Sequence, residues 1–265
     1  MIQHAVRGCA AFAAALAVVA CGGGTVAGVG SGGSGFGLAA GTVTGFGSVI
    51  VDGKAWDVRN ARIEIELDPP QPPIPAEAKL GQQVEIDFAD SGIANTLRVE
   101  PDVIGRVDTV DASANPPVFA VAGQTVRANT DPDSGPVTLL VGYAAIADVR
   151  PNDAIEVHGA ARFDSAAGRY VIQATRVEKL ARLPAGRVRV AGVVEALRPG
   201  TFRLGGLTVN LGSSTAIVPA TRALADGQRV IVWGAEPLGA GPTLTASFVR
   251  IKDTPSAAGA AEISG

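Results

Sequence analysis

Hydrophobic and polar residues alternate along much of the chain with a period of two. Residues 62–68 (RIEIELD), 83–88 (QVEIDF) and 201–204 (TFRL) follow this alternation without a fault. Such a period is typical of β-strands that have one face on a core and the other on water. Turn residues such as Asp52-Gly53 and Asp226-Gly227 separate the runs at short intervals, and no convincing amphipathic helix of three turns is present. The pattern predicts an all-β protein.

The same series of elements recurs three times along the chain. Each copy has a first strand, a hairpin with a glycine turn, a third element and a closing strand. The hairpins are Val51–Val58, Val121–Ala128 and Leu204–Leu211, and the closing strands are Asn95–Val99, Ala174–Val177 and Ala246–Arg250. We therefore expect three repeats, at residues 41–100, 103–180 and 186–252.

Each repeat holds about five short strands, which favours a small closed barrel over an open sheet because closure removes exposed strand edges. We predict three tandem five-stranded β-barrels of the OB type. A domain of this size buries too little surface to be very stable alone. The three barrels are therefore expected to pack against one another. Glu100-Pro101-Asp102 and Lys179–Ala185 are the expected junctions.

The two ends of the chain have compositions unlike that of the repeats. Residues 1–20 carry Arg7 and then an apolar run that is too short to span a membrane, which is the layout of a secretory signal peptide. Residues 21–40 begin with Cys21 and continue as a glycine-rich segment, which predicts a flexible tether. Residues 253–265 are expected to form a disordered tail.

Two resemblances concern the anchor and the repeats. Val18-Val19-Ala20-Cys21 resembles a bacterial lipobox, which implies acylation of Cys21 and cleavage before it. The segments 41–53, 80–84 and 119–126 resemble the bacterial lipoprotein family that carries tandem copies of domain of unknown function 5666, over residues 41–252. That family implies OB-like barrels and a surface or periplasmic location. It implies no activity.

Composition excludes several classes of function. The chain has two histidines and two cysteines, too few for a disulfide scaffold or a Cys/His zinc module. A net charge of −3 argues against non-specific nucleic-acid binding, which needs an excess of lysine and arginine. Gly28-x-Gly30-x-x-Gly33 matches the dinucleotide fingerprint only through glycine density, because no strand precedes it and no helix follows. We expect no metal and no cofactor.

The few residues able to do chemistry have simpler structural interpretations. His158 is the histidine that remains after signal cleavage, and it shares a strand face with Glu156, which predicts a solvated position rather than catalysis. Glu64, Glu66 and Asp68 share one strand face. Such a carboxylate group can serve glycoside hydrolysis, but outward charges more often keep a strand edge soluble.

The two tryptophans are the candidate ligand-stacking residues. OB-type barrels use exposed aromatic rings to bind sugars or bases. Trp56 lies in register with Val58, and Trp233 follows the apolar run Val230-Ile231-Val232. Packing in a core or between barrels is the favoured interpretation for both.

Together these features predict a non-enzymatic lipoprotein that is attached to the membrane through Cys21. We expect it to be an outer membrane lipoprotein that faces the periplasm or the cell surface. Its expected role is that of a scaffold or interaction module, with other envelope proteins or glycans as partners and no nucleic acid. The alternative is a periplasmic protein that binds an oligosaccharide or another small ligand.

Overall fold

The computed structural model describes residues 37–252, apart from residues 46, 47, 52, 91, 166, 239 and 240. Within these residues the chain forms nineteen strands and three short 3-10 turns, at Pro132–Ser134, Ile146–Asp148 and Pro184–Gly186. The predicted all-β class is confirmed. Cys21, the signal peptide, most of the tether and the tail lie outside the described residues.

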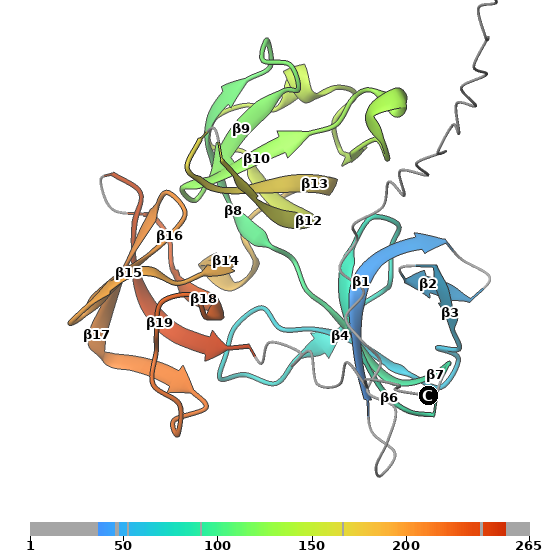
Figure 1. Ribbon diagram of the computed structural model, residues 1–265, viewed down its shortest axis with the longest axis horizontal. Helices are drawn as coiled ribbons and strands as arrows, with labels where there is room; N and C mark the ends of the chain where they lie inside the picture. The colour runs from blue at the N-terminus through green and yellow to red at the C-terminus, as the bar shows by residue number, and fades with distance from the viewer. Residues whose placement is uncertain are drawn as a thin grey trace, which may run out of the picture.

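The strands fall into three units along the chain, which Figure 1 shows as three lobes coloured blue to cyan, green to yellow and orange to red. Unit 1 holds β1 (Gly37–Gly45), β2 (Val49–Val51), β3 (Lys54–Trp56), β4 (Arg62–Ile65), β5 (Ile74–Pro75), β6 (Gln83–Asp90) and β7 (Ile93–Val99). Unit 2 holds β8 (Val103–Asp111), β9 (Val118–Val121), β10 (Gln124–Ala128), β11 (Leu139–Val141), β12 (Ala154–Asp164) and β13 (Arg169–Leu180). Unit 3 holds β14 (Arg187–Val193), β15 (Glu195–Arg198), β16 (Thr201–Leu204), β17 (Leu207–Val218), β18 (Arg229–Ala235) and β19 (Thr243–Ile251).

One set of strand pairings recurs in the three units. The closing strand always runs antiparallel to the third element and parallel to a strand that follows the hairpin turn. The antiparallel pairs are β6–β7, β12–β13 and β18–β19, and the parallel pairs are β4–β7, β10–β13 and β17–β19. The first strand of each unit pairs with the third element as well. The repeated sequence pattern thus corresponds to a repeated topology.

The expectation of three separate closed barrels needs correction. The strands form one seven-stranded sheet in unit 1 and one twelve-stranded sheet that runs through units 2 and 3. The two units are joined where β8 pairs with β14, at Ile104–Arg189 and Val103–Val190. This pairing has a physical reason, because it satisfies backbone groups that would otherwise remain open on a strand edge.

The hydrophobic core follows the same division. Unit 1 has its own core, which includes Trp56, Ile86 and Leu97. Units 2 and 3 share one continuous core, in which Val107 and Phe119 belong to the same cluster as Phe202 and Val232. Half-buried Leu67 packs against both cores. Units 2 and 3 are therefore joined by a shared hydrophobic core as well as by backbone hydrogen bonds.

Units 2 and 3 also touch where two hairpin turns meet. The Gly206 N–H donates to the Gly123 carbonyl over 3.1 Å, and the Gln124 side-chain amide donates to the Leu204 carbonyl over 2.7 Å. A Cβ atom on Gly206 would overlap the Gly123 carbonyl oxygen. This close approach explains why both turns carry glycine.

A Gly206→Ala variant is expected to lower the free energy of unfolding by about 1–3 kcal/mol, because its Cβ must push the two turns apart. Gly212→Ala is the matched control in the same unit. The nearest atom to a Cβ at position 212 is the Thr215 hydroxyl at 3.9 Å, and neither glycine has a left-handed φ. Chemical denaturation of both variants measures the difference, and equal losses would contradict a tight contact between the turns.

Candidate functional site

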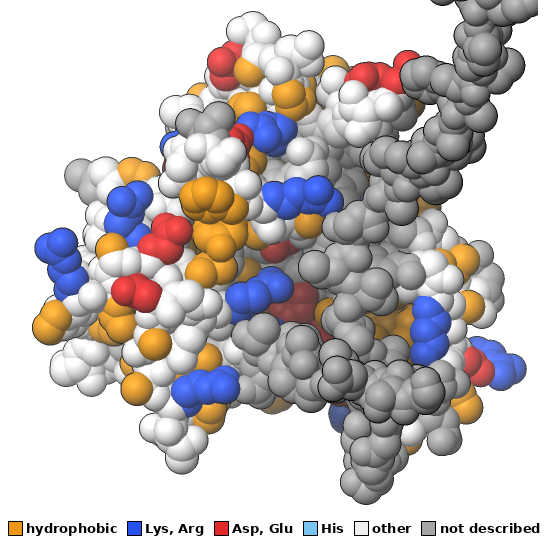
Figure 2. All heavy atoms as spheres, viewed as in Figure 1, with side chains coloured by type: hydrophobic (Ala, Val, Ile, Leu, Met, Phe, Trp, Pro, Cys, Tyr) orange, Lys and Arg blue, Asp and Glu red, His pale blue; other side chains and the backbone are white. Residues whose placement is uncertain are grey.

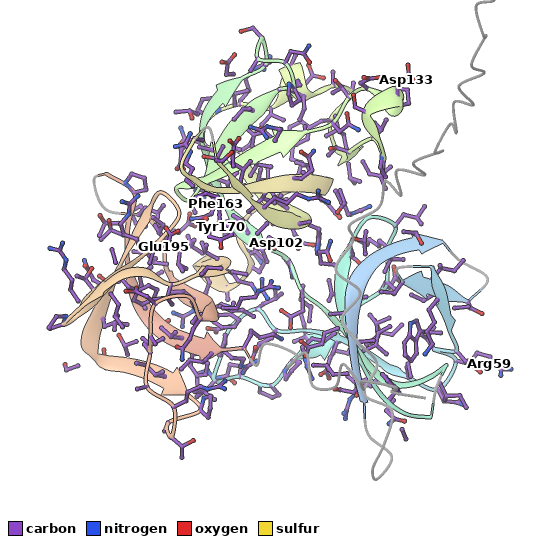
Figure 3. The ribbon with its side chains drawn as sticks, viewed as in Figure 1. Arg59, Asp102, Asp133, Phe163, Tyr170 and Glu195 are labelled. Carbon is purple, nitrogen blue, oxygen red and sulfur yellow. The ribbon has the colours of Figure 1, made fainter. Side chains whose placement is uncertain are left out.

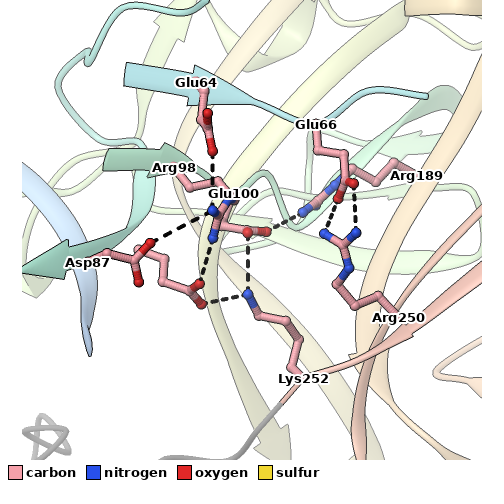
Figure 4. Close-up of polar contacts among 9 residues, drawn as sticks. Glu64, Glu66, Asp87, Arg98, Glu100, Arg189, Arg250 and Lys252 are labelled. Carbon is pink, nitrogen blue, oxygen red and sulfur yellow. Dashed lines mark hydrogen bonds and ion pairs between the residues drawn. The ribbon is translucent and has the colours of Figure 1, made fainter. Parts of the chain in front are cut away.

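The densest group of charged side chains lies where unit 1 meets unit 3 (Figure 4). In unit 1, the register of neighbouring strands brings the charged side chains together. Arg98 on β7 is the cross-strand partner of both Glu64 on β4 and Glu85 on β6. The Arg98 guanidinium donates to Glu64 over 3.2 Å and to Glu85 over 3.1 Å. One arginine thus holds together two carboxylates from different strands.

Unit 3 presents cations to this acidic surface. Arg250 pairs with Glu66, and the Lys252 ammonium lies 2.5 Å from Glu85 and 3.3 Å from Glu100. Arg187 also pairs with Asp68, and Arg189 pairs with Glu100. Among the described residues, five ion pairs therefore join the two units, two of them made by Lys252. The contact is therefore complementary in charge, acidic from unit 1 and basic from unit 3. We call it the charged junction.

The charged junction is built around Trp233. Side chains of a strand alternate between its two faces, and Val230 and Val232 point into the large core. Trp233 and Ile231 therefore lie on the other face of β18, where they form a separate cluster with Phe248. The Arg189 and Arg250 guanidinium carbons lie 5.4 Å and 5.8 Å from the indole ring. These distances are within the range of cation–π attraction.

Glu100 occupies the centre of the charged junction. Burial alone would raise the pKa of its carboxyl, but Arg189, Lys252 and Arg98 outweigh burial and hold that pKa below its ordinary value. Arg189 is only 3% exposed, and two of its guanidinium nitrogens, Nε and Nη1, have no hydrogen-bond partner. Each group of this pair depends on the other, because a buried charge without a counter-ion is costly.

A second junction joins unit 1 to unit 2. The turn at Lys79–Gln83 seats on strands β12 and β13 through four contacts. The Gln83 N–H donates to His158 Nδ1 over 3.1 Å, and the Thr175 hydroxyl donates to the Gly81 carbonyl over 2.6 Å. Arg176 donates to the Leu80 carbonyl over 3.2 Å. Lys79 forms an ion pair with Glu178 at 3.2 Å. We call these contacts the turn socket.

His158 is a structural part of the turn socket. The solvated position expected for it is wrong, because the side chain is 0% exposed. Its face was predicted correctly, since Ile155 and Val157 point into the core and His158 points the opposite way with Glu156. Unit 1 covers that opposite face. His158 Nδ1 accepts the Gln83 N–H, so the imidazole is neutral and donates from Nε2 to Glu156 over 2.8 Å.

Asp102 lies between the two junctions on the segment that links units 1 and 2 (Figure 3). Its carboxylate accepts the Gly159 N–H over 2.8 Å, its own N–H donates to the Val157 carbonyl, and its carbonyl accepts the Ala191 N–H. One residue thereby binds the backbone of units 2 and 3. Burial raises the pKa of the Asp102 carboxyl, against the opposing effect of the hydrogen bond from the Gly159 N–H.

The raised pKa of Asp102 predicts a specific pH dependence. The folded state binds the Asp102 proton more tightly than the unfolded state, so this group lowers stability above its folded pKa and the penalty disappears as pH falls. An Asp102→Asn variant is therefore expected to gain stability relative to wild type as pH rises from 4 toward 8. Thermal unfolding across that range measures the difference.

Asp131→Asn is the control for this experiment. Hydrogen bonds from Ser134 and from the Asp133 N–H lower the pKa of the exposed Asp131 carboxyl, so its contribution has the opposite sign. Because the folded pKa lies below the ordinary value of 3.8, the control variant is expected to lose stability relative to wild type only as pH rises toward about 4. Between pH 4 and 8 its stability relative to wild type should stay nearly constant. If both variants follow the same trend, burial does not govern the titration of Asp102.

The acidic strand face of unit 1 also differs from its expected role. Glu64 and Glu66 are each 9% exposed, so the interpretation as charges that keep a strand edge soluble is wrong for them. Asp68 is about one-third exposed and pairs with Arg187 of unit 3 at 2.5 Å. Glu66 and Asp68 thus pair with unit 3, whereas Glu64 pairs with Arg62 and Arg98 inside unit 1.

Both candidate stacking tryptophans lie inside the protein. Trp56 is 1% exposed and packs on Phe88 with a centroid distance of 4.8 Å, and the Lys54 ammonium lies 4.1 Å from its ring centre. Trp233 is 0% exposed. This placement is what packing in a core and between units predicts. Cys21, the predicted lipidation site, lies outside the described residues.

The sequence pattern did not single out four cations of the charged junction: Arg98, Arg189, Arg250 and Lys252. A signal was present, because the outward positions are acidic on the strands of unit 1 and basic in Arg187-Val188-Arg189-Val190 of unit 3. Opposite charges on the outward faces of two repeats indicate mutual contact. They do not indicate which strands meet.

The chemistry available at the two junctions is that of ion pairs and hydrogen bonds. Across residues 37–252, within the described positions, no group of three or more His, Cys, Asp or Glu side chains is placed to hold a metal ion. His158 has backbone and carboxylate partners, and none of its observed hydrogen bonds involves a serine. The hydrogen bonds observed at His158 therefore serve the contact between units 1 and 2.

Comparison with known proteins identifies one segment. Residues 191–250 match the family described as Domain of unknown function (DUF5666). The DUF5666 match covers most of unit 3, from the end of β14 to the end of β19. A comparison with curated proteins found no match. Among the described residues, no helix has the length and apolar character needed to cross a membrane.

Proposed function

We propose that this protein is a lipid-anchored scaffold of the cell envelope, without enzymatic activity, whose three β units form one body that presents surfaces to partners. The main support is that its charged side chains form contacts between the units. Glu66 and His158 are buried in contacts between units, and half-buried Glu100 lies in such a contact too. Sequence alone offered these three residues as candidate chemistry or as linker. A binding scaffold needs such fixed geometry between its units.

The anchor in this proposal is Cys21, acylated after removal of residues 1–20. The tether is the segment from Cys21 to residue 36, because β1 begins at Gly37. The lipobox resemblance supports it, and two or more acyl chains give stable attachment where one gives only marginal binding. The protein then sits at the outer membrane, facing the periplasm or the cell surface. Other envelope proteins or glycans are its partners.

The proposal also gives each unit the OB-type barrel topology. Support comes from the repeated pairings, above all from the parallel pair between the closing strand and a later strand of the hairpin region, which is β4, β10 or β17. The DUF5666 match to unit 3, together with these pairings, extends the same domain type to units 1 and 2.

The test begins with metabolic labelling by radioactive palmitate in cells that express wild type or Cys21→Ser. Wild type is expected to incorporate label and to sediment with membranes, and the variant is expected to do neither. Equal labelling of the two chains, or absence of label from both, would overturn the anchor. Cross-linking in intact cells then tests the scaffold: partners captured by wild type and lost in a Glu66→Arg variant would support it.

One observation favours ligand binding as a second function. Phe163 on β12 is 59% exposed and forms an edge-to-face pair with Tyr170 on β13, with ring centroids 5.4 Å apart. Figure 2 shows hydrophobic side chains gathered near the middle of the face where Figure 3 labels this pair. Exposed aromatic rings are the usual platform for sugar stacking. Titration of wild type and Phe163→Ala with an oligosaccharide tests this function.

A further inference from the structure

A groove lies beside the turn socket, where unit 1 approaches unit 2 and the segment between units 2 and 3. Its volume is about 550 Å³, within the range of small-molecule sites. Ile65, Leu67 and Val99 of unit 1 line one part, and Pro184 lines another. Six of the ten lining residues are apolar and none is aromatic, and the other four are Glu77, Lys79, Gln82 and Glu156. Lys79 is the one cation among them, and its ammonium pairs with Glu178, outside the lining.

Glu156 brings the one deeply buried charge to this lining. Its residue is 8% exposed, and one carboxylate oxygen accepts a hydrogen bond from His158 Nε2. The imidazole is neutral, because its Nδ1 accepts the Gln83 N–H. His158 therefore orients the carboxylate and leaves its negative charge in place.

The cations near Glu156 are engaged with another carboxylate. Glu178 is the cross-strand partner of Glu156. Arg176 donates to Glu178 over 2.7 Å, and the Lys79 ammonium lies 3.2 Å from the same side chain. Exposed Glu77 adds a further negative charge to the groove lining. A buried carboxylate of this kind is stabilised strongly by a counter-ion that reaches it.

From these observations we infer that the groove binds an organic cation: a primary amine carried on an aliphatic chain. The ammonium group pairs with Glu156, and the aliphatic chain lies along Ile65, Leu67 and Val99. A second amine at the far end of the ligand meets Glu77. This binding site goes beyond the proposed scaffold function and does not depend on the anchor.

The composition of the groove lining indicates how such a ligand affects the stability of the protein. Its lining comes from β4, β7 and the segment after β5 in unit 1, from β12 in unit 2 and from the 3-10 turn before β14. A ligand in contact with all of them stabilises their association by binding the assembled state alone. The expected consequence is a higher melting temperature in the presence of the amine.

Isothermal titration of the purified chain, residues 22–265, with cadaverine provides the test, and 1,5-pentanediol is the neutral isostere. Cadaverine is expected to bind and the diol is expected not to bind. Glu156→Gln is expected to weaken cadaverine binding on the order of tenfold or more, the effect of one charged hydrogen bond. Glu195→Gln, a half-buried carboxylate of unit 3 outside the groove lining, is the matched control and should bind as wild type does.

A second variant keeps the test decisive if Glu156→Gln does not fold. Glu77 is exposed, so Glu77→Gln is expected to fold normally and to weaken cadaverine binding several-fold. Equal binding of diamine and diol, equal binding by wild type and both groove variants, or absence of cadaverine binding to wild type would each overturn the inference. None of these outcomes bears on palmitate labelling, so failure here is distinguishable from failure of the proposed function.

Discussion

Replacing Trp233 by alanine is expected to lower the free energy of unfolding by about 3–5 kcal/mol, the usual loss for a buried aromatic residue. The indole is fully buried, and its removal leaves a cavity between Phe248 and the guanidinium groups of Arg189 and Arg250. The loss has two parts, because apolar burial disappears and so does the ring surface that both cations face. Urea denaturation followed by circular dichroism measures it.

Phe163→Ala is the control for the Trp233 variant. It removes another large ring, but one that is 59% exposed, so a small change in stability is expected. If Trp233→Ala is no more destabilising than Phe163→Ala, the charged junction is not packed around the indole. Binding of an oligosaccharide that is lost in Trp233→Ala without loss of stability would instead favour a role in ligand stacking.

A Glu100→Gln variant is expected to lose about 3 kcal/mol, since removal of one partner leaves a buried charge without its counter-ion. The stranded group is Arg189, which is 3% exposed and pairs with Glu100 in the native protein. The measurement is again the free energy of unfolding. Asp57→Asn, which breaks the exposed pair between Asp57 and Arg59 on unit 1, should leave stability unchanged within error.

A double variant distinguishes the interaction between Glu100 and Arg189 from the contacts that each side chain makes with other residues. Glu100→Gln combined with Arg189→Met removes both charges, and the remaining cost is expected to be smaller than the sum of the two single losses. Additive losses would mean that the two side chains do not interact. A loss in Asp57→Asn as large as that in Glu100→Gln would show that burial in the junction has no special effect.

Glu156 and His158 show what the alternation of a strand predicts and what it does not. Alternation predicted that both side chains share one face of β12, and they do. The same pattern predicted water around that face, whereas the turn at Lys79–Gln83 covers it. Alternation with a period of two indicates which side chains point away from the core of their own unit. It does not report what lies on the other side.

The sequence by itself determined the all-β class and the recurring order of strands and glycine turns, because local alternation and turn chemistry decide these features within a few residues of chain. Only the tertiary structure decided that β8 joins β14 into a shared sheet, and that acidic strands of unit 1 meet basic strands of unit 3. Those contacts pair residues far apart along the chain, such as Glu66 with Arg250. Their free energy depends on burial and on distance in space, and neither is encoded in the pattern of any one segment.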